Sequence, residues 1–201
     1  MICVIDYGVG NLFSVEKALL QFSSDVKVTS SKEEIEKADK LVLPGVGDFG
    51  ECMSNLEATG LIPTIMKKLE EGTPLLGICV GLQIMFEGSE ENPSAKGLGI
   101  FKGMVRKINA PELKVPHMGW NSLDFSEPRL PLYDGLNEHP YVYFVHSYYA
   151  VPEDKSIITA TTEYGETLTA AVAKDNIMAT QFHPEKSGDV GLKILQNFIE
   201  M

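Results

Sequence analysis

The chain has 201 residues, of which 44% are hydrophobic and 22% charged, as is typical of a soluble globular protein with a sizeable core. The formal net charge of -11 argues against nucleic acid as a partner, because few basic groups are available to neutralise phosphates. No apolar run approaches the length of a membrane span, and no basic region precedes the apolar N-terminal residues. Neither a membrane anchor nor a signal peptide is therefore expected.

The cysteines and histidines give no sign of a structural metal or a disulfide framework. Cys3, Cys52 and Cys79 are an odd number of widely spaced residues, unlike paired disulfides or a CxxC metal site. The four histidines lack the close helical spacing of common zinc motifs. We therefore expect a cytoplasmic protein without metal or cofactor.

Buried-strand patterns alternate with helical patterns in the first half of the chain. Helical spacing of Leu12, Val15, Leu19 and Phe22 predicts a first helix, and Ser31 followed by Glu34 predicts a capping box for a second. A further helix is expected over 62–71, ending at Gly72. The expected strands are 2–6, 26–29, 40–45 and 74–79. This alternation is typical of βαβ units around a largely parallel sheet.

The second half is rich in strand patterns and closes with an amphipathic helix. Strands are expected within 103–108, 121–125, 141–151, 157–165 and 168–182, the last range containing a hairpin at the letters KDN, and the helix over 187–200. The predicted fold is one α/β domain, residues 1–201. It has an open, largely parallel central sheet, helices on both faces and β-rich additions from the second half. Ligands bind outside the carboxyl ends of such strands, where Gly45 and Cys79 fall.

The letters GICVGLQ place Cys79 between Gly77 and Gly81, where an expected strand meets an expected helix. This arrangement has the logic of a nucleophile elbow, in which a sharp turn raises the nucleophile and glycines allow close backbone approach. A buried structural cysteine is the alternative, and this stretch alone does not decide between them. Cys3 and Cys52 lack glycine neighbours and are expected to be structural.

A cysteine nucleophile needs a base and a group that orients the base. His183 follows an apolar strand pattern, Pro184 breaks that strand, and Glu185 can fold back to accept a hydrogen bond from the imidazole. The alternative is a strand-end histidine beside a solvated glutamate. The presence of an elbow cysteine in the same chain favours the catalytic interpretation.

With these residues in place, the chain resembles the class I (triad) glutamine amidotransferases, which have a flavodoxin-like sheet. Within that family it resembles the group of glutaminase subunits of imidazole glycerol phosphate synthase, from histidine biosynthesis. The resemblance runs through DYGVGNLFSV (6–15), LPGVGDFG (43–50), GICVGLQIMFEGSEE (77–91), VPHMGWN (115–121), YFVHSYYA (143–150) and QFHPEKSG (181–188).

The resemblance implies roles for individual residues. Cys79 would attack the side-chain amide of glutamine, His183 would carry the proton and Glu185 would orient His183. Val80 and one amide of the PGVG turn would form the oxyanion hole, with Val46 preferred over Gly45 or Gly47. Residues implied to hold glutamine are Gln83, Glu91, His146, Ser147 and Tyr148, for which surface charge or strand packing are the alternatives. Residues implied at the partner contact are Asn11, His117, Met118, Gly119, Trp120 and Asn121. Asn11 is also a helix-cap candidate. For Met118 and Trp120 the alternative is ordinary core packing.

The family also implies a partner, a (β/α)₈-barrel cyclase that forms a heterodimer with this chain and receives ammonia from it. We expect the isolated chain to be nearly inactive and the loaded partner to reorient the PGVG loop. Three alternatives remain at this point. A glutaminase of another synthase would bind another partner, a cysteine hydrolase would act on peptides or esters, and a non-catalytic subunit would keep the fold without activity.

Overall fold

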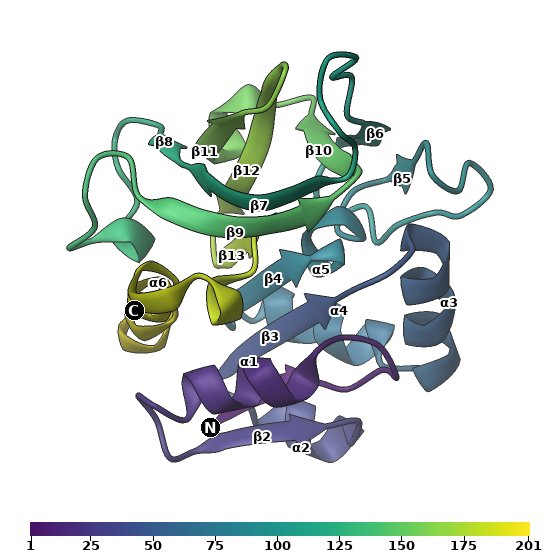
Figure 1. The fold of residues 1–201 in the computed structure, drawn as a ribbon. Helices are drawn as coiled ribbons and strands as arrows, with labels where there is room; N and C mark the ends of the chain where they lie inside the picture. Colours follow the sequence, from purple (N-terminus) through teal and green to yellow (C-terminus); the bar gives the residue numbers. More distant parts are fainter.

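The computed structural model describes residues 1–201 and has an eight-stranded mixed sheet at its centre (Figure 1). Along this sheet the order is β2 (Val26–Thr29), β1 (Ile2–Ile5), β3 (Lys40–Gly45), β4 (Leu75–Cys79), β13 (Ile177–Thr180), β12 (Thr167–Lys174), β11 (Ile158–Glu163) and β8 (Asp124–Phe125). The first five strands are parallel and the last three join through antiparallel pairs. The predicted α/β class is confirmed, but the second half does more than add an appendage, because it supplies four strands of the central sheet.

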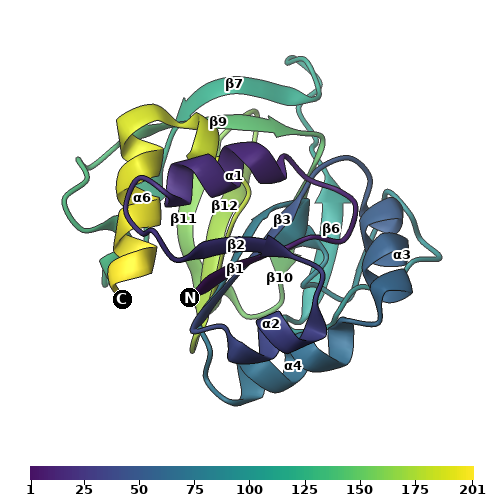
Figure 2. The same ribbon diagram turned by 90° about the horizontal axis from the view of Figure 1, so that it is seen from below.

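Helices cover both faces of this sheet. Figure 2 shows α1 (Leu12–Leu19) and α6 (Gly188–Glu200) together on one face, and α2 (Lys32–Lys37) and α4 (Ile62–Glu70) on the other, with α3 (Phe49–Thr59) next to α4. Helix α1 ends earlier than its apolar spacing predicts, so Phe22 lies beyond it and is exposed. No helix has both the length and the apolar character needed to cross a bilayer.

Two smaller sheets complete the molecule. One contains β10 (Tyr148–Pro152), β6 (Gly103–Lys107) and β5 (Gly88–Ser89), and the other contains β7 (His117–Ser122) and β9 (Tyr141–His146). The remaining short elements are α5 (Val80–Gln83), η1 (Pro131–Tyr133), η2 (Lys155–Ile157) and η3 (Pro184–Lys186). The run 141–151, predicted as one strand, is thus broken at Ser147, where the chain passes from one sheet to the other.

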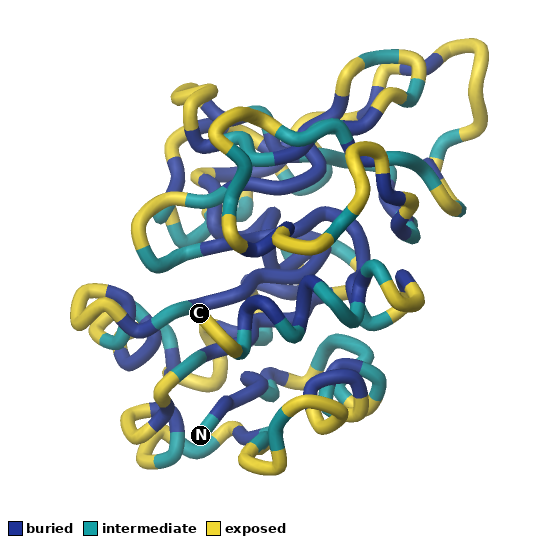
Figure 3. The backbone as a smooth tube through the Cα atoms, turned by 90° about the vertical axis from the view of Figure 1, so that its left-hand side faces the viewer, coloured by how far each residue is buried: buried dark blue, intermediate teal, exposed yellow.

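The central strands are buried along their length, as Figure 3 shows by the dark blue segments in the middle of the molecule. All five residues of β4 are buried, and so are five of the six in β3. Parallel strands covered on both faces are expected to be continuously apolar, which is why these two were recognisable as short hydrophobic runs.

The predicted capping box at the start of α2 does not form. Ser31 makes no side-chain capping bond, and its own N–H donates to Thr29 Oγ1. The Glu34 carboxylate instead contacts Lys27 and the Thr29 hydroxyl on the neighbouring strand β2. The Glu34 side chain, which the capping box would have used, is therefore bound by the charged Lys27 side chain instead.

The join between β4 and α5 depends on glycine because two backbones nearly touch there. A Cβ atom on Gly81 would lie 1.9 Å from the Leu43 carbonyl oxygen, and one on Gly45 would lie 2.5 Å from the Gly81 nitrogen. Any side chain at either position would push α5 away from β3.

We expect Gly81→Ala to destabilise the protein by about 3 kcal/mol, the upper part of the range for overpacking a tight interior. Gly60→Ala is the comparison variant, because Gly60 has a left-handed backbone (φ +68°), which Gly81 does not, but open space around its Cβ position. Its cost should be about 1 kcal/mol, from left-handed backbone strain alone. Urea unfolding of both variants measures the two costs, and equal values would contradict the close-approach argument.

Candidate active site

Cys79 lies at the last position of β4, at the carboxyl ends of the parallel strands, and precedes α5 directly. Its backbone has φ 55° and ψ −111°, a conformation rare for a residue with a side chain. Such strain persists where the surroundings impose it, and it is common at functional sites. The residue also lines a cavity of about 700 Å³, so the elbow expected from the sequence is present and opens onto a ligand-sized space.

His183 and Glu185 come together beside this cavity. His183 Nδ1 is 2.8 Å from Glu185 Oε1, and both side chains are almost completely buried. The segment is held from two sides, because the His183 N–H donates to the Tyr143 carbonyl and the Ser187 hydroxyl donates to the His183 carbonyl. The turn at Pro184, part of η3, folds the glutamate back onto the imidazole as the sequence suggested.

The charge state of His183 follows from its neighbours. Burial disfavours the imidazolium, but the Cys79 thiol and the Glu185 carboxylate together outweigh burial and raise the pKa of His183 to about 9. The Glu185 carboxylate accepts a hydrogen bond from Nδ1–H, and with a pKa of about 9 the other ring nitrogen, Nε2, also carries a proton near pH 7. That Nε2 atom is buried and has no hydrogen-bond partner in the protein. Its proton is therefore free to be exchanged with the Cys79 sulfur and with a bound substrate.

A residue that sequence reasoning missed, Gln181, lies against the cysteine. Its side-chain Nε2 is 3.7 Å from Cys79 Sγ, and its Oε1 accepts from Gln83 Nε2 at 3.0 Å. Gln83 also donates to the Tyr148 carbonyl. Gln83, expected to hold substrate, therefore lies at the cavity with its amide nitrogen already engaged by the protein. The available signal for Gln181 was a polar residue just after an apolar strand and two positions before His183.

The other residues expected to hold glutamine also line the cavity: Glu91, His146, Ser147 and Tyr148. The Glu91 carboxylate accepts a hydrogen bond from the Phe49 N–H at the start of α3, and burial raises its pKa. Lys186, the last residue of η3, lines the same space and was not singled out from the sequence.

The wall at His146 is built on a chain of buried hydrogen bonds. Its Nδ1 lies 2.9 Å from the Tyr148 carbonyl, which can only accept, so its Nε2 must accept from His117 Nδ1, also 2.9 Å away. Asn121 then donates to His117 Nε2 at 3.3 Å and to the Glu163 carbonyl. The donor and acceptor of every hydrogen bond are therefore fixed along this series, which runs from Asn121 through His117 and His146 to the Tyr148 carbonyl.

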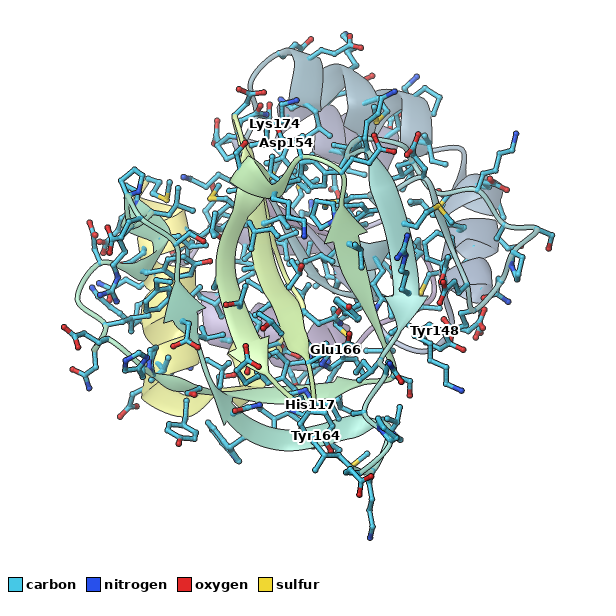
Figure 4. The ribbon with its side chains drawn as sticks, turned by 90° about the horizontal axis from the view of Figure 1, so that it is seen from above. His117, Tyr148, Asp154, Tyr164, Glu166 and Lys174 are labelled. Atoms are coloured by element: carbon cyan, nitrogen blue, oxygen red, sulfur yellow. The ribbon has the colours of Figure 1, made fainter.

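Figure 4 shows His117 and Tyr164 close together, and the two rings stack with centroids 4.0 Å apart. Phe144 stacks on His117 as well, at 4.7 Å. Burial lowers the pKa of His117 to about 4 and that of His146 to about 3, so both imidazoles are neutral near pH 7.

Strand alternation divides the residues expected at the partner contact. Met118 and Trp120 are strongly exposed on the outer side of β7, whereas His117 is buried and Asn121 turns its amide inward. The contact of HMGWN with a partner stays a prediction, and in the structure the side chains of His117 and Asn121 face inward. Gly119 has φ +129°, a backbone conformation favoured by glycine.

Asn11 and three of the candidate oxyanion residues lie around the same cavity. Asn11 caps α1, its Oδ1 accepting from the Ser14 N–H, and it also lines the cavity. The candidate oxyanion residues Val46, Gly47 and Val80 line the cavity too, while Gly45 is buried against α5. No group of three or more His, Cys, Asp or Glu side chains is arranged to hold a metal ion.

The fold and the site together define a class of protein. The family model for class-I glutamine amidotransferases matches residues 3–201, and the chain belongs to this family. The resemblance expected from the motifs is confirmed.

Within this family, the most similar relatives found carry one name. Proteins named imidazole glycerol phosphate synthase subunit HisH match over the whole chain, from Syntrophotalea carbinolica (51% identical, all of both chains), Acaryochloris marina (50%, all of this chain and 94% of the relative) and Methanocaldococcus jannaschii (49%, all of both chains).

Solved structures share the fold at lower identity. A crystal structure of a glutamine amidotransferase aligns with TM-score 0.77 and 19% identity over 100% of this chain and 98% of its own. PurLQS from Thermotoga maritima aligns with TM-score 0.77 and 19% identity over 99% and 97%. At this identity the likeness establishes the fold.

We expect the free energy of unfolding to fall as pH drops from 6.5 toward 4, because the unfolded chain then binds protons that buried His117 and His146 do not. His117→Phe keeps the aromatic stack and removes one titrating group. Its loss of stability between pH 7 and 4.5 should be smaller than that of the wild type by about 2 to 3 kcal/mol. Urea unfolding across this range tests the point, and parallel pH profiles would contradict it.

Proposed function

We propose that this chain is the glutaminase subunit of an imidazole glycerol phosphate synthase, which hydrolyses L-glutamine to glutamate and ammonia through a cysteinyl thioester. The observation that carries the proposal is the arrangement of Cys79 on its strained elbow, with the buried His183–Glu185 pair at the same cavity. The full-length identity of about half to proteins named HisH supports the choice of synthase.

The chemistry follows from the positions of these groups. His183 Nε2 holds the proton that the Cys79 thiol gives up, and the resulting thiolate attacks the side-chain amide carbon of glutamine. The imidazolium, stabilised by Glu185, gives that proton to the departing nitrogen, and ammonia leaves. Water then attacks the thioester carbon while His183 acts as base, releasing glutamate and restoring the thiol. The raised pKa of His183 suits it to hold the proton between these steps.

The tetrahedral intermediate carries negative charge on the former amide oxygen, which requires N–H donors. The Val80 and Val46 amides are our candidates, because both residues line the cavity beside Cys79. Loss of one such donor costs roughly 100- to 1,000-fold in rate, so the orientation of the PGVG loop can act as a switch.

Glutamine is held by the part of the cavity wall formed by Gln83, Glu91 and the 146–148 segment. Support comes from their common position on one cavity and from the hydrogen bonds that fix the Tyr148 carbonyl. The substrate has an ammonium and a carboxylate group, and Glu91 and Lys186 offer opposite charges at the same cavity.

The partner is a (β/α)₈-barrel cyclase that binds as a heterodimer over β7 and receives the ammonia. Exposed Met118 and Trp120 offer apolar anchors on this strand. Pro116, one residue before β7, lines the cavity, so the reaction site adjoins the proposed interface. A glutaminase whose oxyanion loop responds to the loaded partner would release ammonia only when the acceptor is present.

We expect Glu185→Gln to lower kcat for glutamine hydrolysis in the complex by about 100- to 10,000-fold, since an amide neither fixes the imidazole tautomer nor stabilises its charge. The alkaline limb of the kcat/KM profile should also move to lower pH, because loss of the carboxylate lowers the pKa of His183. Exposed Glu112→Gln is the control and should behave as wild type, while Cys79→Ala should be inactive. An unshifted pH profile in Glu185→Gln would count against the assigned role.

We expect Trp120→Ala to weaken binding of the cyclase subunit by roughly 30-fold or more, as truncation of an aromatic anchor does. Met104→Ala removes another exposed apolar side chain, from β6, and should leave the affinity unchanged. Titration calorimetry measures both affinities. Equal affinities for the two variants would place the partner elsewhere.

A further inference from the structure

The Tyr148 carbonyl fixes the orientation of the buried Gln83 amide beside it. A carbonyl oxygen can only accept, so the atom of Gln83 that lies 2.9 Å from it must be the amide nitrogen. The same carbonyl also accepts from His146 Nδ1 at 2.9 Å, which uses its second lone pair. Because Gln83 is buried and its nitrogen is held in this way, its amide group has one orientation in the folded protein.

The orientation of Gln83 in turn determines that of a second amide, in Gln181. Gln83 Nε2 carries two hydrogens and lies 3.0 Å from Gln181, so the atom that faces it must be an acceptor, Gln181 Oε1. The other atom of the same amide, Gln181 Nε2, then faces Cys79 Sγ at 3.7 Å, a hydrogen-bond distance for the larger sulfur atom. Gln181 therefore presents an N–H donor, and not an oxygen, to the sulfur.

This donor depends on the sulfur for its hydrogen bond. Cys79 Sγ is the only partner that the structure gives Gln181 Nε2, and the Gln181 side chain is fully buried. A buried N–H group without a partner costs free energy. A thiol sulfur is a weak acceptor, whereas a hydrogen bond to an ionised acceptor is roughly twice as strong as a neutral one. The amide therefore interacts more favourably with the thiolate of Cys79 than with its thiol.

The charges around the sulfur are few. The titratable groups that act on it are His183, which is paired with Glu185, and the buried side chains of Tyr7 and Cys52. Burial raises the pKa of Tyr7 and raises that of Cys52 to about 11, so both keep their protons near pH 7. His183, with its pKa of about 9, supplies the positive charge. Gln181 thus adds a neutral donor to a sulfur whose charged neighbour is His183.

We propose that Gln181 is a further catalytic residue, whose side-chain N–H group donates to Cys79 Sγ and stabilises the thiolate that attacks the substrate. The role deepens the proposed glutaminase function and rests on it. The thiol proton still goes to His183, and Gln181 transfers none. Gln181 and His183 lie two residues apart on the segment that follows β13, so one short stretch delivers both groups to the sulfur. Gln83 orients Gln181 as Glu185 orients His183.

Ionisation of Cys79 in the isolated full chain tests this role without relying on activity. The thiolate is followed by its ultraviolet absorbance as the pH is raised, and the same titration of Cys79→Ala is subtracted to remove the tyrosines and the other cysteines. Gln181→Met keeps the length of the side chain and loses the donor. We expect the midpoint of Cys79 ionisation to rise by about one pH unit, a tenfold change in the ionisation constant. An unchanged or lower midpoint would overturn the proposal.

Asn197→Leu is the matched control for this titration. Asn197 on α6 is another buried amide, and its nitrogen donates to the Leu132 and Asp134 carbonyls, away from the cavity. The variant therefore loses comparable hydrogen bonds without touching the sulfur, and its midpoint should equal that of the wild type. A rise as large as in Gln181→Met would show an effect of general destabilisation and would refute the assignment.

NMR of the side-chain amide groups gives a second test in which Gln181 itself is kept. The Gln181 amide protons should have different chemical shifts in the wild type and in Cys79→Ala, because the variant removes the acceptor. The Asn197 amide protons should stay where they are. Identical Gln181 signals in the two proteins would show that its amide does not bind the sulfur.

Kinetics in the complex with the cyclase subunit separate the two contacts of Gln181. At neutral pH we expect kcat for glutamine hydrolysis to fall about 10-fold in Gln181→Met, following the loss of thiolate, with KM changed by under about twofold. A raised KM at unchanged kcat would mean that Gln181 only supports Gln83 in the cavity wall, and the proposal would fall. A wild-type complex that does not hydrolyse glutamine, beside the expected shift in ionisation, would refute the proposed function alone.

Discussion

The site depends on the absence of a side chain at Gly81. Because the backbone of α5 packs directly on β3, with the Leu43 carbonyl only 1.9 Å from where a Cβ would stand, the chain must turn sharply as it leaves β4. Cys79 lies on that turn and accepts a strained backbone as a result. The same contact buries Gly45 against α5, so the nucleophile and the oxyanion loop are positioned by one close approach.

The second requirement is that polar groups buried around the cavity be paired. His183 with Glu185, His146 with His117, and Gln83 with Gln181 are each buried and hydrogen-bonded. Unpaired, such groups would each cost about 1 to 3 kcal/mol or more. The exceptions are informative, because the buried atoms without partners include His183 Nε2, the atom that a proton-transfer mechanism leaves free for the substrate reaction.

Much of the fold could be predicted because its central strands are apolar and short, and its helices carry one apolar face. The expected positions of β1, β2, β3 and β4 agree with the structure. The second half was harder, since a strand pattern does not state which sheet the strand joins. The break at Ser147 lies inside a continuous run of strand-forming residues, and only the change of sheet reveals it.

The site shows the same division. Cys79, His183 and Glu185 stand out because they occur in motifs whose geometry is local. Gln181 depends on a contact between segments distant in sequence, and no local pattern marks it. The inward position of His117 was not foreseen for a different reason. Its motif covers both sides of a strand, and alternation sends neighbouring side chains in opposite directions.

The distribution of sulfur in the molecule has a practical consequence. Cys3 and Cys52 are fully buried in the core, whereas Cys79 alone among the three lines the cavity. A small thiol-directed electrophile therefore meets one accessible target per folded molecule. The stoichiometry of its incorporation counts intact sites directly, and a fluorescent version placed there would report events in the cavity from within, without any added cysteine.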